Sequence, residues 1–226
     1  MKLVLPVIHH IEKDTTWEQA EIAYKCGADG IFLISHYDED IVLGPIAKEI
    51  NNEKWKNSYG DKFKLGLNLL NTKALDSFDR VVDYNLDTLW LDNAGINSSG
   101  ISSLTLSLME KMKKTSVEVL ASVAFKYQTH EPLPAQAAKI AQNNGFIATT
   151  SGAATGSAPS LEKIAFMSQA TNGQLGVASG MTLENISDFI PYLSHILVAT
   201  GVSIDEHRFD PVLLKQFVEI CHNFKS

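Results

Sequence analysis

The sequence predicts an α/β fold of the (β/α)8 class, a TIM barrel that occupies residues 1–226 as a single domain. Short apolar runs alternate with helix-like patterns along the whole chain, as expected for parallel strands joined by helices. Eight such units average about 28 residues each, which suits a small barrel. No low-complexity linker or shift in composition marks a domain boundary. An open, doubly wound sheet is the alternative, because spacing alone does not show that a sheet closes.

The predicted strands are short apolar runs bounded by polar residues or glycines. They span 3–8, 30–34, 64–69, 88–92, 117–125, 146–150, 175–179 and 195–200. Helix starts are predicted from capping residues and from prolines that suit a first turn. These signals are Thr15 with Glu18, Pro134, Pro159, Thr182, and Asp210 with Pro211.

Composition and charge narrow the class of protein. The chain is 45% hydrophobic and carries a formal net charge of −7, which argues against a general binder of nucleic acid or of an anionic membrane. Cys26 and Cys221 belong to no CxxC pair or Cys/His cluster, so neither a disulfide framework nor a zinc site is expected. No apolar run has the length of a membrane span or a signal-peptide core. We therefore expect a cytoplasmic protein, with a homo-oligomer left open.

Three late strands end alike, in "ATTSG", "VASG" and "VATG". In a barrel, ligands bind at the ends of the strands and in the loops that follow them. Glycine lets the backbone approach a ligand, and the amide groups of such bends favour an anion. The predicted phosphate-binding residues are Ser151, Gly152, Thr155, Gly156, Ser179, Gly180, Thr200 and Gly201. The alternative is that these small residues only make tight turns.

More reactive side chains follow the earlier strands, and the predicted catalytic residues are Asp92, Lys126, His9 and Asn68. Alternation along the strands places Asn68 and Lys126 inward and directs Phe125 toward the helices. His36 follows the second strand and is a further candidate. Simpler interpretations are a turn for Asp92, a structural role for His9 and a solvated loop for Lys126.

Neither a metal nor a nucleotide cofactor is predicted. His36, Asp38, Glu39 and Asp40 are hard-metal ligand types, but they lie in one loop without a known metal-binding spacing, which favours a solvated acidic loop. No GxGxxG follows the first strand and no GxxxxGK[ST] is present, so neither a dinucleotide fold nor a P-loop is supported.

Several segments together resemble the BtpA family over nearly the whole chain. They are "LGLNLLNTKALDSFDRVVDYNLDTLWLD", "VEVLASVAFKY", "ATTSGAATGSAPSLEKI" and "GVASGMTLENISDFIPYLSHILVATGVS". The resemblance implies a phosphate-binding TIM barrel, and the founding members of that family are associated with photosystem I biogenesis. It points to Asn68, Lys126 and Asn185, along with the two Ser-Gly motifs.

The early chain departs from that family pattern at "ISHYDED". "ASGMTLENI" is separately similar to the phosphate-site strand of quinolinate phosphoribosyltransferase, an analogy that favours a sugar phosphate.

Taken together, the sequence predicts an enzyme for a small phosphorylated metabolite, either a sugar or a nucleotide-like compound. Glycosidic cleavage or ribosyl transfer is the favoured chemistry, with Asp92 as base, Lys126 or His9 as acid, and Asn68 orienting a hydroxyl group. The alternatives are a lyase or isomerase that uses Lys126 and a non-catalytic assembly factor that retains the phosphate pocket.

Overall fold

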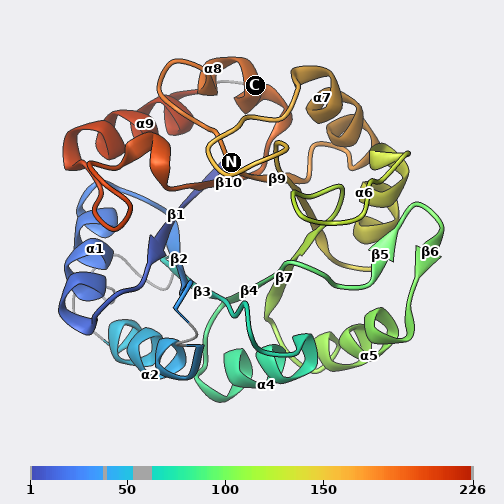
Figure 1. Ribbon diagram of the computed structural model, residues 1–226, viewed down its shortest axis with the longest axis horizontal. Coiled ribbons are helices and arrows are strands. Elements are labelled where there is room, and N and C mark those ends of the chain that lie inside the picture. Colours follow the sequence, from blue (N-terminus) through green and yellow to red (C-terminus); the bar gives the residue numbers. More distant parts are fainter. Residues whose placement is uncertain (1, 38–39, 53–62, 225–226) are drawn as a thin grey trace.

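The barrel is closed. The computed structural model describes residues 2–37, 40–52 and 63–224, and Figure 1 looks along the barrel. Eight parallel strands pair in the order β1-β2-β3-β4-β7-β8-β9-β10, and β10 returns to β1 with His195 opposite Leu3. The strands are β1 Leu3–His9, β2 Gly30–Ile34, β3 Lys64–Asn68, β4 Thr88–Leu91, β7 Glu118–Ser122, β8 Ile147–Thr150, β9 Leu175–Ala178 and β10 His195–Val198. The predicted TIM barrel is confirmed, and the open sheet is wrong.

Helices surround the strands as an outer ring (Figure 1). They are α1 Lys13–Lys25, α2 Asp40–Asn51, α4 Ala74–Asp83, α5 Ser103–Met112, α6 Pro134–Asn143, α7 Leu161–Ala170, α8 Ile186–Phe189 and α9 Pro211–Asn223. Two short 3-10 helices, η1 Ile190–Tyr192 and η2 Thr200–Val202, lie before and after β10. A hairpin that the sequence did not predict, β5 Ile96–Asn97 with β6 Gly100–Ile101, follows β4.

Two of the predicted helix starts are confirmed. Pro134 is the first residue of α6, and the Asp210 carboxylate caps α9 by accepting from the amides of Val212 and Leu213.

Three predicted starts are wrong. Helix α1 begins at Lys13, before Thr15, whose hydroxyl donates to Glu12. Ser160 rather than Pro159 caps α7. Helix α8 begins only at Ile186, because Thr182 enters a turn in which its amide donates to the Asn185 side chain.

Apolar side chains form two layers. The larger one lies between the barrel and its helices and includes Phe78, Phe146 and Phe217, all at most 1% exposed. The smaller one fills the inside of the barrel with Leu5, Val7, Phe32, Ile34, Trp90, Leu120, Phe125, Ala178 and Leu197. This inner layer blocks the barrel, so no channel runs through it. A ligand that enters from the open end reaches these apolar side chains as a floor.

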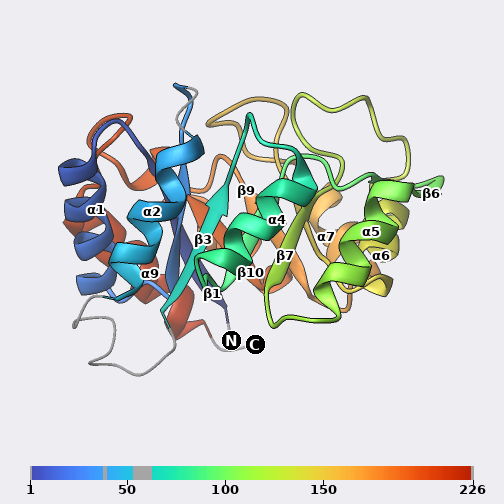
Figure 2. The ribbon, with the colours of Figure 1, turned by 90° about the horizontal axis from the view of Figure 1, so that it is seen from below.

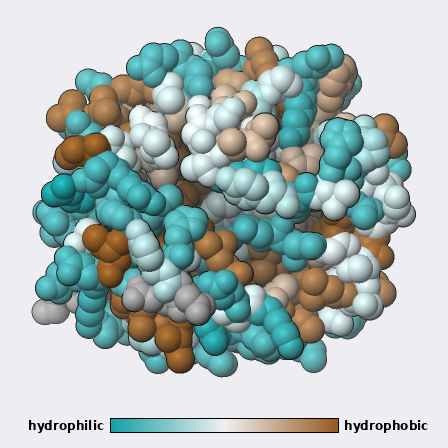
Figure 3. All heavy atoms as spheres, in the orientation of Figure 1, coloured by the Kyte–Doolittle hydropathy of each residue, from teal (hydrophilic) through white to brown (hydrophobic). Residues whose placement is uncertain are grey.

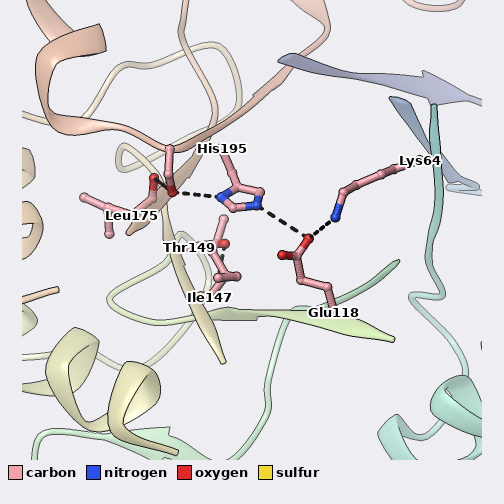
Figure 4. A network of polar contacts seen from close by, with 7 residues as sticks. Lys64, Glu118, Ile147, Thr149, Leu175 and His195 are labelled. Atoms are coloured by element: carbon pink, nitrogen blue, oxygen red, sulfur yellow. Dashed lines mark hydrogen bonds and ion pairs between the residues drawn. The ribbon is translucent and has the colours of Figure 1, made fainter. Parts of the chain in front are cut away.

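A polar network occupies the opposite end, where the strands begin (Figure 4). Glu118 of β7 accepts a hydrogen bond from Lys64 of β3 at 2.9 Å, and His195 of β10 lies 3.5 Å from the same carboxylate oxygen. The His195 imidazole, and after it the Lys64 ammonium, lower the pKa of Glu118 to about 2, although burial alone would raise it. The network links three strands across the barrel.

Strand β7 is shorter than the sequence predicted. It ends at Ser122, and Ala124 takes a left-handed conformation with φ of +49°. This turn breaks the alternation on which the prediction for Phe125 depended. Phe125 therefore points into the barrel and packs against Trp90, with ring centroids 5.9 Å apart.

Candidate functional site

A cavity of about 820 Å³ opens at the end of the barrel where the strands finish. Figure 2 shows the long loops on this side and the two termini on the other. Residues from every barrel strand, or from the loop after it, line the cavity. Its floor is the apolar layer inside the barrel, including Val7, Trp90 and Leu197. Figure 3, in the orientation of Figure 1, shows hydrophobic residues among hydrophilic ones near the centre of this face.

Asp92 lies at the cavity with Asn68 behind it. The Asp92 side chain is exposed and lines the cavity. Asn68 is only 1% exposed, is not among the lining residues, and donates from Nδ2 to Asp92 Oδ1 and to Trp90 O, both at 3.1 Å. Asn68 therefore orients the Asp92 carboxylate, rather than a substrate hydroxyl as the sequence suggested.

Lys126 extends from the loop after β7 into the cavity. Its backbone amide donates to Ser151 Oγ at 2.8 Å, and its ammonium donates to Thr155 Oγ1 at 3.1 Å. Burial lowers the pKa of Lys126, while Tyr127 and Asp92 act in the opposite direction. Two residues of the loop after β8, part of the predicted phosphate site, therefore hold Lys126 in place.

Lys163 of α7 supports the same region, and the sequence analysis missed it. Its Nζ donates to Ala124 O at 2.6 Å and to Ser151 O at 2.9 Å, so one ammonium ties together the loops after β7 and β8. Burial lowers the pKa of Lys163 to about 8. A lysine in the first turn of an amphipathic helix gives no sequence signal for this role.

The loops after β8, β9 and β10 pack backbone against backbone at their glycines. A Cβ atom at Gly152 would lie 2.0 Å from Ser157 O, one at Gly180 2.2 Å from Ala158 N, and one at Gly201 2.0 Å from Met181 O. These positions exclude any side chain. Packing alone is therefore a sufficient reason for the three glycines, whether or not an anion binds.

Six of the eight predicted phosphate residues line the cavity: Thr155, Gly156, Ser179, Gly180, Thr200 and Gly201. Ser151 and Gly152 do not, because both are buried below the loop, where Ser151 Oγ donates to Gly152 O. The structure therefore brings six of the eight predicted residues together at the cavity, whereas Ser151 and Gly152 support the loop from below.

Two of these residues have clear local roles. Ser179 Oγ lies 3.0 Å from Ala154 O and 3.2 Å from Ser157 O, so it fastens the β9 loop to the β8 loop. Thr200 is exposed at the cavity and begins η2. The first amides of a helical turn have no partners within that turn. Thr200 and Gly201, the first two residues of this turn, both line the mouth of the cavity.

His9 lies at the end of β1 beside two other histidines. Its ring meets His36 edge to face at 5.1 Å, and its carbonyl oxygen contacts His207 Nδ1 at 3.1 Å. Burial, and after it the neighbouring His36, lower the pKa of His9 to about 4. The ring is therefore neutral at pH 7, which does not suit the acid role that the sequence suggested.

Among the described residues, no group of three or more His, Cys, Asp or Glu side chains is arranged to hold a metal ion. Asp38 and Glu39 of the acidic loop lie outside the described residues. In the described ranges, no helix is both long and apolar enough to cross a membrane.

Comparisons with known proteins give a likeness of structure. No family model matches the chain, and no curated protein matches it in sequence. Phosphoribosyl anthranilate isomerase from Thermus thermophilus superposes with a TM-score of 0.68 at 12% identity, over 100% of both chains. Thiamine phosphate pyrophosphorylase from Pyrococcus furiosus gives 0.67 at 14% identity, over 98% of this chain and 95% of that one.

A third similar structure contains a bound ligand. It is a phosphoribosyl anthranilate isomerase in complex with reduced 1-(o-carboxyphenylamino)-1-deoxyribulose 5-phosphate, and it superposes with a TM-score of 0.63 at 14% identity, over 99% of this chain and 100% of that one. Identities this low establish the shared fold alone. The chain is a TIM barrel like these enzymes.

Proposed function

We propose that the protein is an enzyme that acts on a phosphorylated sugar or nucleotide-like small molecule, by glycosidic cleavage or ribosyl transfer. The observation that carries the proposal is the cavity itself: Asp92 and Lys126 line it together with the small-residue loops after β8, β9 and β10. A phosphate held at those loops would leave the rest of the ligand near the two reactive side chains. The resemblance to the BtpA family and the phosphorylated compounds in the neighbours' names support the same class.

The loops after β9 and β10 bring Gly180, Thr200 and Gly201 to the cavity, which the acidic Asp205 and Glu206 also line. Among the described residues that line the cavity, Lys126 is the only lysine or arginine. Backbone amides at Gly180, Thr200 and Gly201 would therefore carry much of the recognition, as they do where phosphates meet glycine-rich bends.

The proposed chemistry divides an acid and a base between two side chains. Asp92 takes a proton from the attacking water, or stabilises positive charge at the anomeric carbon. The bond to the leaving group breaks with its electron pair going to the leaving atom, which receives a proton from Lys126. Because burial lowers the pKa of Lys126, its ammonium is a stronger acid than a free lysine. The neutral His9 ring is available to accept a hydrogen bond from the ligand.

The matched pair Thr200→Asp and Thr200→Asn tests the phosphate site. Thr200 is exposed, and no hydrogen bond from its side chain contributes to the loop contacts described above. A carboxylate about 6 Å from a phosphate charge costs roughly 1–3 kcal/mol in a partly exposed site. Isothermal titration with inorganic phosphate and ribose 5-phosphate should therefore show affinity roughly 5- to 150-fold weaker for Thr200→Asp and nearly unchanged for Thr200→Asn. Equal loss in both variants, or loss in neither, would place the anion elsewhere.

Turnover is tested with a mixture of nucleotides and sugar phosphates, followed by mass spectrometry. Release of a free base or sugar phosphate, absent with Asp92→Asn, is the expected result. Retention of a compound without turnover would favour the assembly factor that the BtpA resemblance suggests.

A lyase or isomerase that forms a Schiff base is the second candidate, because the lowered pKa of Lys126 also favours a nucleophilic amine. Borohydride treatment of the protein with a carbonyl-bearing sugar phosphate would then leave a reduced adduct on Lys126. Lys126→Arg, which keeps the charge but not the nucleophile, should show no adduct.

A further inference from the structure

One side of the cavity is aromatic. Trp90 of β4, together with Phe125 and Tyr127 of the segment after β7, lines it, and we call these three residues the aromatic wall. Trp90 is fixed by a hydrogen bond from its indole nitrogen to Ser122 Oγ at 3.0 Å, and Phe125 meets it edge to face. Trp90 and Phe125 belong to the floor, whereas Tyr127 stands at the mouth with 84% of its surface exposed.

Tyr127 holds a backbone conformation that large side chains rarely adopt. Its φ is +65°, three residues after the left-handed Ala124. Such conformations are unfavourable for a bulky residue and gather at functional sites. Here the conformation presents an unburied aromatic ring at the cavity instead of packing it into the core. Its hydroxyl oxygen lies 3.4 Å from Thr155 Oγ1, beside the predicted phosphate loop.

The segment that carries Tyr127 is held at several points. Gln128 accepts from the Phe125 amide at 3.1 Å and donates to Asp92 O at 2.6 Å and to Ser122 O at 3.0 Å. The Lys126 amide is held by Ser151. The wall is therefore preorganised, which lowers the entropic cost of binding a flat group against it.

Within the wall, Tyr127 lies beside the loop after β8, and Trp90 lies across the cavity from the loop after β10. In the order of the barrel, β4 lies across from β10, so Trp90 and Thr200 stand on opposite sides of the cavity. At about 820 Å³ the cavity is in the upper part of the size range of small-molecule sites, which run from roughly 300 to 1,000 Å³. A pentose phosphate alone would leave the aromatic side unfilled.

We propose that the ligand carries a planar ring that stacks on Tyr127, so that its class is a nucleotide-like phosphate ester rather than a simple sugar phosphate. The inference rests on the proposed function, since it uses the same cavity and the same phosphate end. Stacking on an aromatic side chain tolerates many rings because each presents a π face. The aromatic wall therefore indicates that the ligand has a planar ring, but does not identify which ring it is.

The test compares ribose 5-phosphate with three of its derivatives, in which carbon 1 carries adenine, uracil or nicotinamide. Titration calorimetry should show at least one derivative binding the parental protein about tenfold or more tightly than ribose 5-phosphate. Tyr127→Ala should reduce that ratio about tenfold and leave the affinity for ribose 5-phosphate unchanged, whereas Tyr127→Phe should preserve the ratio. Because Tyr127 is exposed, neither variant should alter folding, which circular dichroism checks.

Tyr37→Ala is the matched control, because Tyr37 is an exposed tyrosine outside the cavity lining, and the ratio should stay at its parental value. The inference is overturned if no derivative binds better than ribose 5-phosphate, or if Tyr127→Ala leaves the ratio intact. Absence of any binding by inorganic phosphate and ribose 5-phosphate would instead refute the proposed function, so the two failures are distinguishable.

Discussion

Replacing Glu118 by glutamine should weaken the folded barrel and change how its stability depends on pH. The glutamine keeps the size of the side chain and removes the charge that faces Lys64 and His195 (Figure 4). Its amide is a weaker partner for Lys64, and the ion pair is lost. The effect should appear at neutral pH and vanish in acid.

The magnitude follows from the pKa of Glu118, which falls from an ordinary value of 4.5 to about 2 on folding. That difference corresponds to about 3 kcal/mol of stability at pH 7. It is an upper value, because 3.5 Å is long for a hydrogen bond from His195.

The sign of the pH dependence is set by which state binds the proton. Above about pH 4.5 the carboxylate is charged in both states, and its full contribution is present. Between pH 4.5 and 2 the unfolded chain takes up a proton that the folded protein does not, so the free energy of unfolding falls.

Urea unfolding followed by tryptophan fluorescence measures this at pH 7, 4 and 3. Glu118→Gln should lose about 1–3 kcal/mol at pH 7, and its difference from the parent should shrink steadily toward pH 2. Asp79→Asn is the matched control, because the Lys111–Asp79 pair is exposed and should contribute under about 1 kcal/mol. A loss no larger than that of the control, or a loss independent of pH, would refute this account of the network.

Three further predictions concern the mouth of the barrel. Once a substrate is identified, Asp92→Asn and Lys126→Met should lower kcat by about a hundredfold or more, and unchanged kcat would remove both from the mechanism. Gly180→Ala should lower the free energy of unfolding by about 2–4 kcal/mol, against about 1 kcal/mol for Gly173→Ala. Both glycines have positive φ, but only at Gly180 would the added Cβ meet a backbone atom. Equal losses in the two variants would contradict this account of the packing. Lys163→Met should cost about 2 kcal/mol in urea unfolding by leaving two carbonyl groups without their donor, and a neutral result would make that tie unimportant.

The barrel could be predicted because its signals are local and repeated. Each barrel strand is a short run of buried residues, such as Gly30–Ile34, whose five residues are all buried. Periodicity and turn residues specify such runs without knowledge of their partners. Closure then follows from eight similar units of similar length, since each new strand adds to the edge left by the last.

Residues whose role depends on distant partners could not be predicted in the same way. Phe125 was assigned to the wrong side because the left-handed Ala124 ends the alternation, and an alanine gives no sign of that conformation. Lys163 acts through carbonyl groups 39 and 12 residues away in the chain. The neutral state of His9 at pH 7 depends on burial and on the neighbouring His36, neither of which is visible in the sequence.

The glycines at the mouth show why a correct motif can still support two interpretations. Ser-Gly and Thr-Gly at three strand ends predicted an anion site, yet Gly152, Gly180 and Gly201 are all required by backbone packing. The two roles are compatible, because Gly180 and Gly201 line the cavity as well as packing against neighbouring backbone. Substitution of a glycine would disturb both roles at once and could not separate them.

Substitution of Thr200 can separate the two roles, because its side chain is exposed at the cavity. A charge added there acts on a bound anion without entering the contacts between the loops. Loss of phosphate binding in Thr200→Asp but not in Thr200→Asn is therefore evidence for a ligand that the glycine motif alone cannot supply.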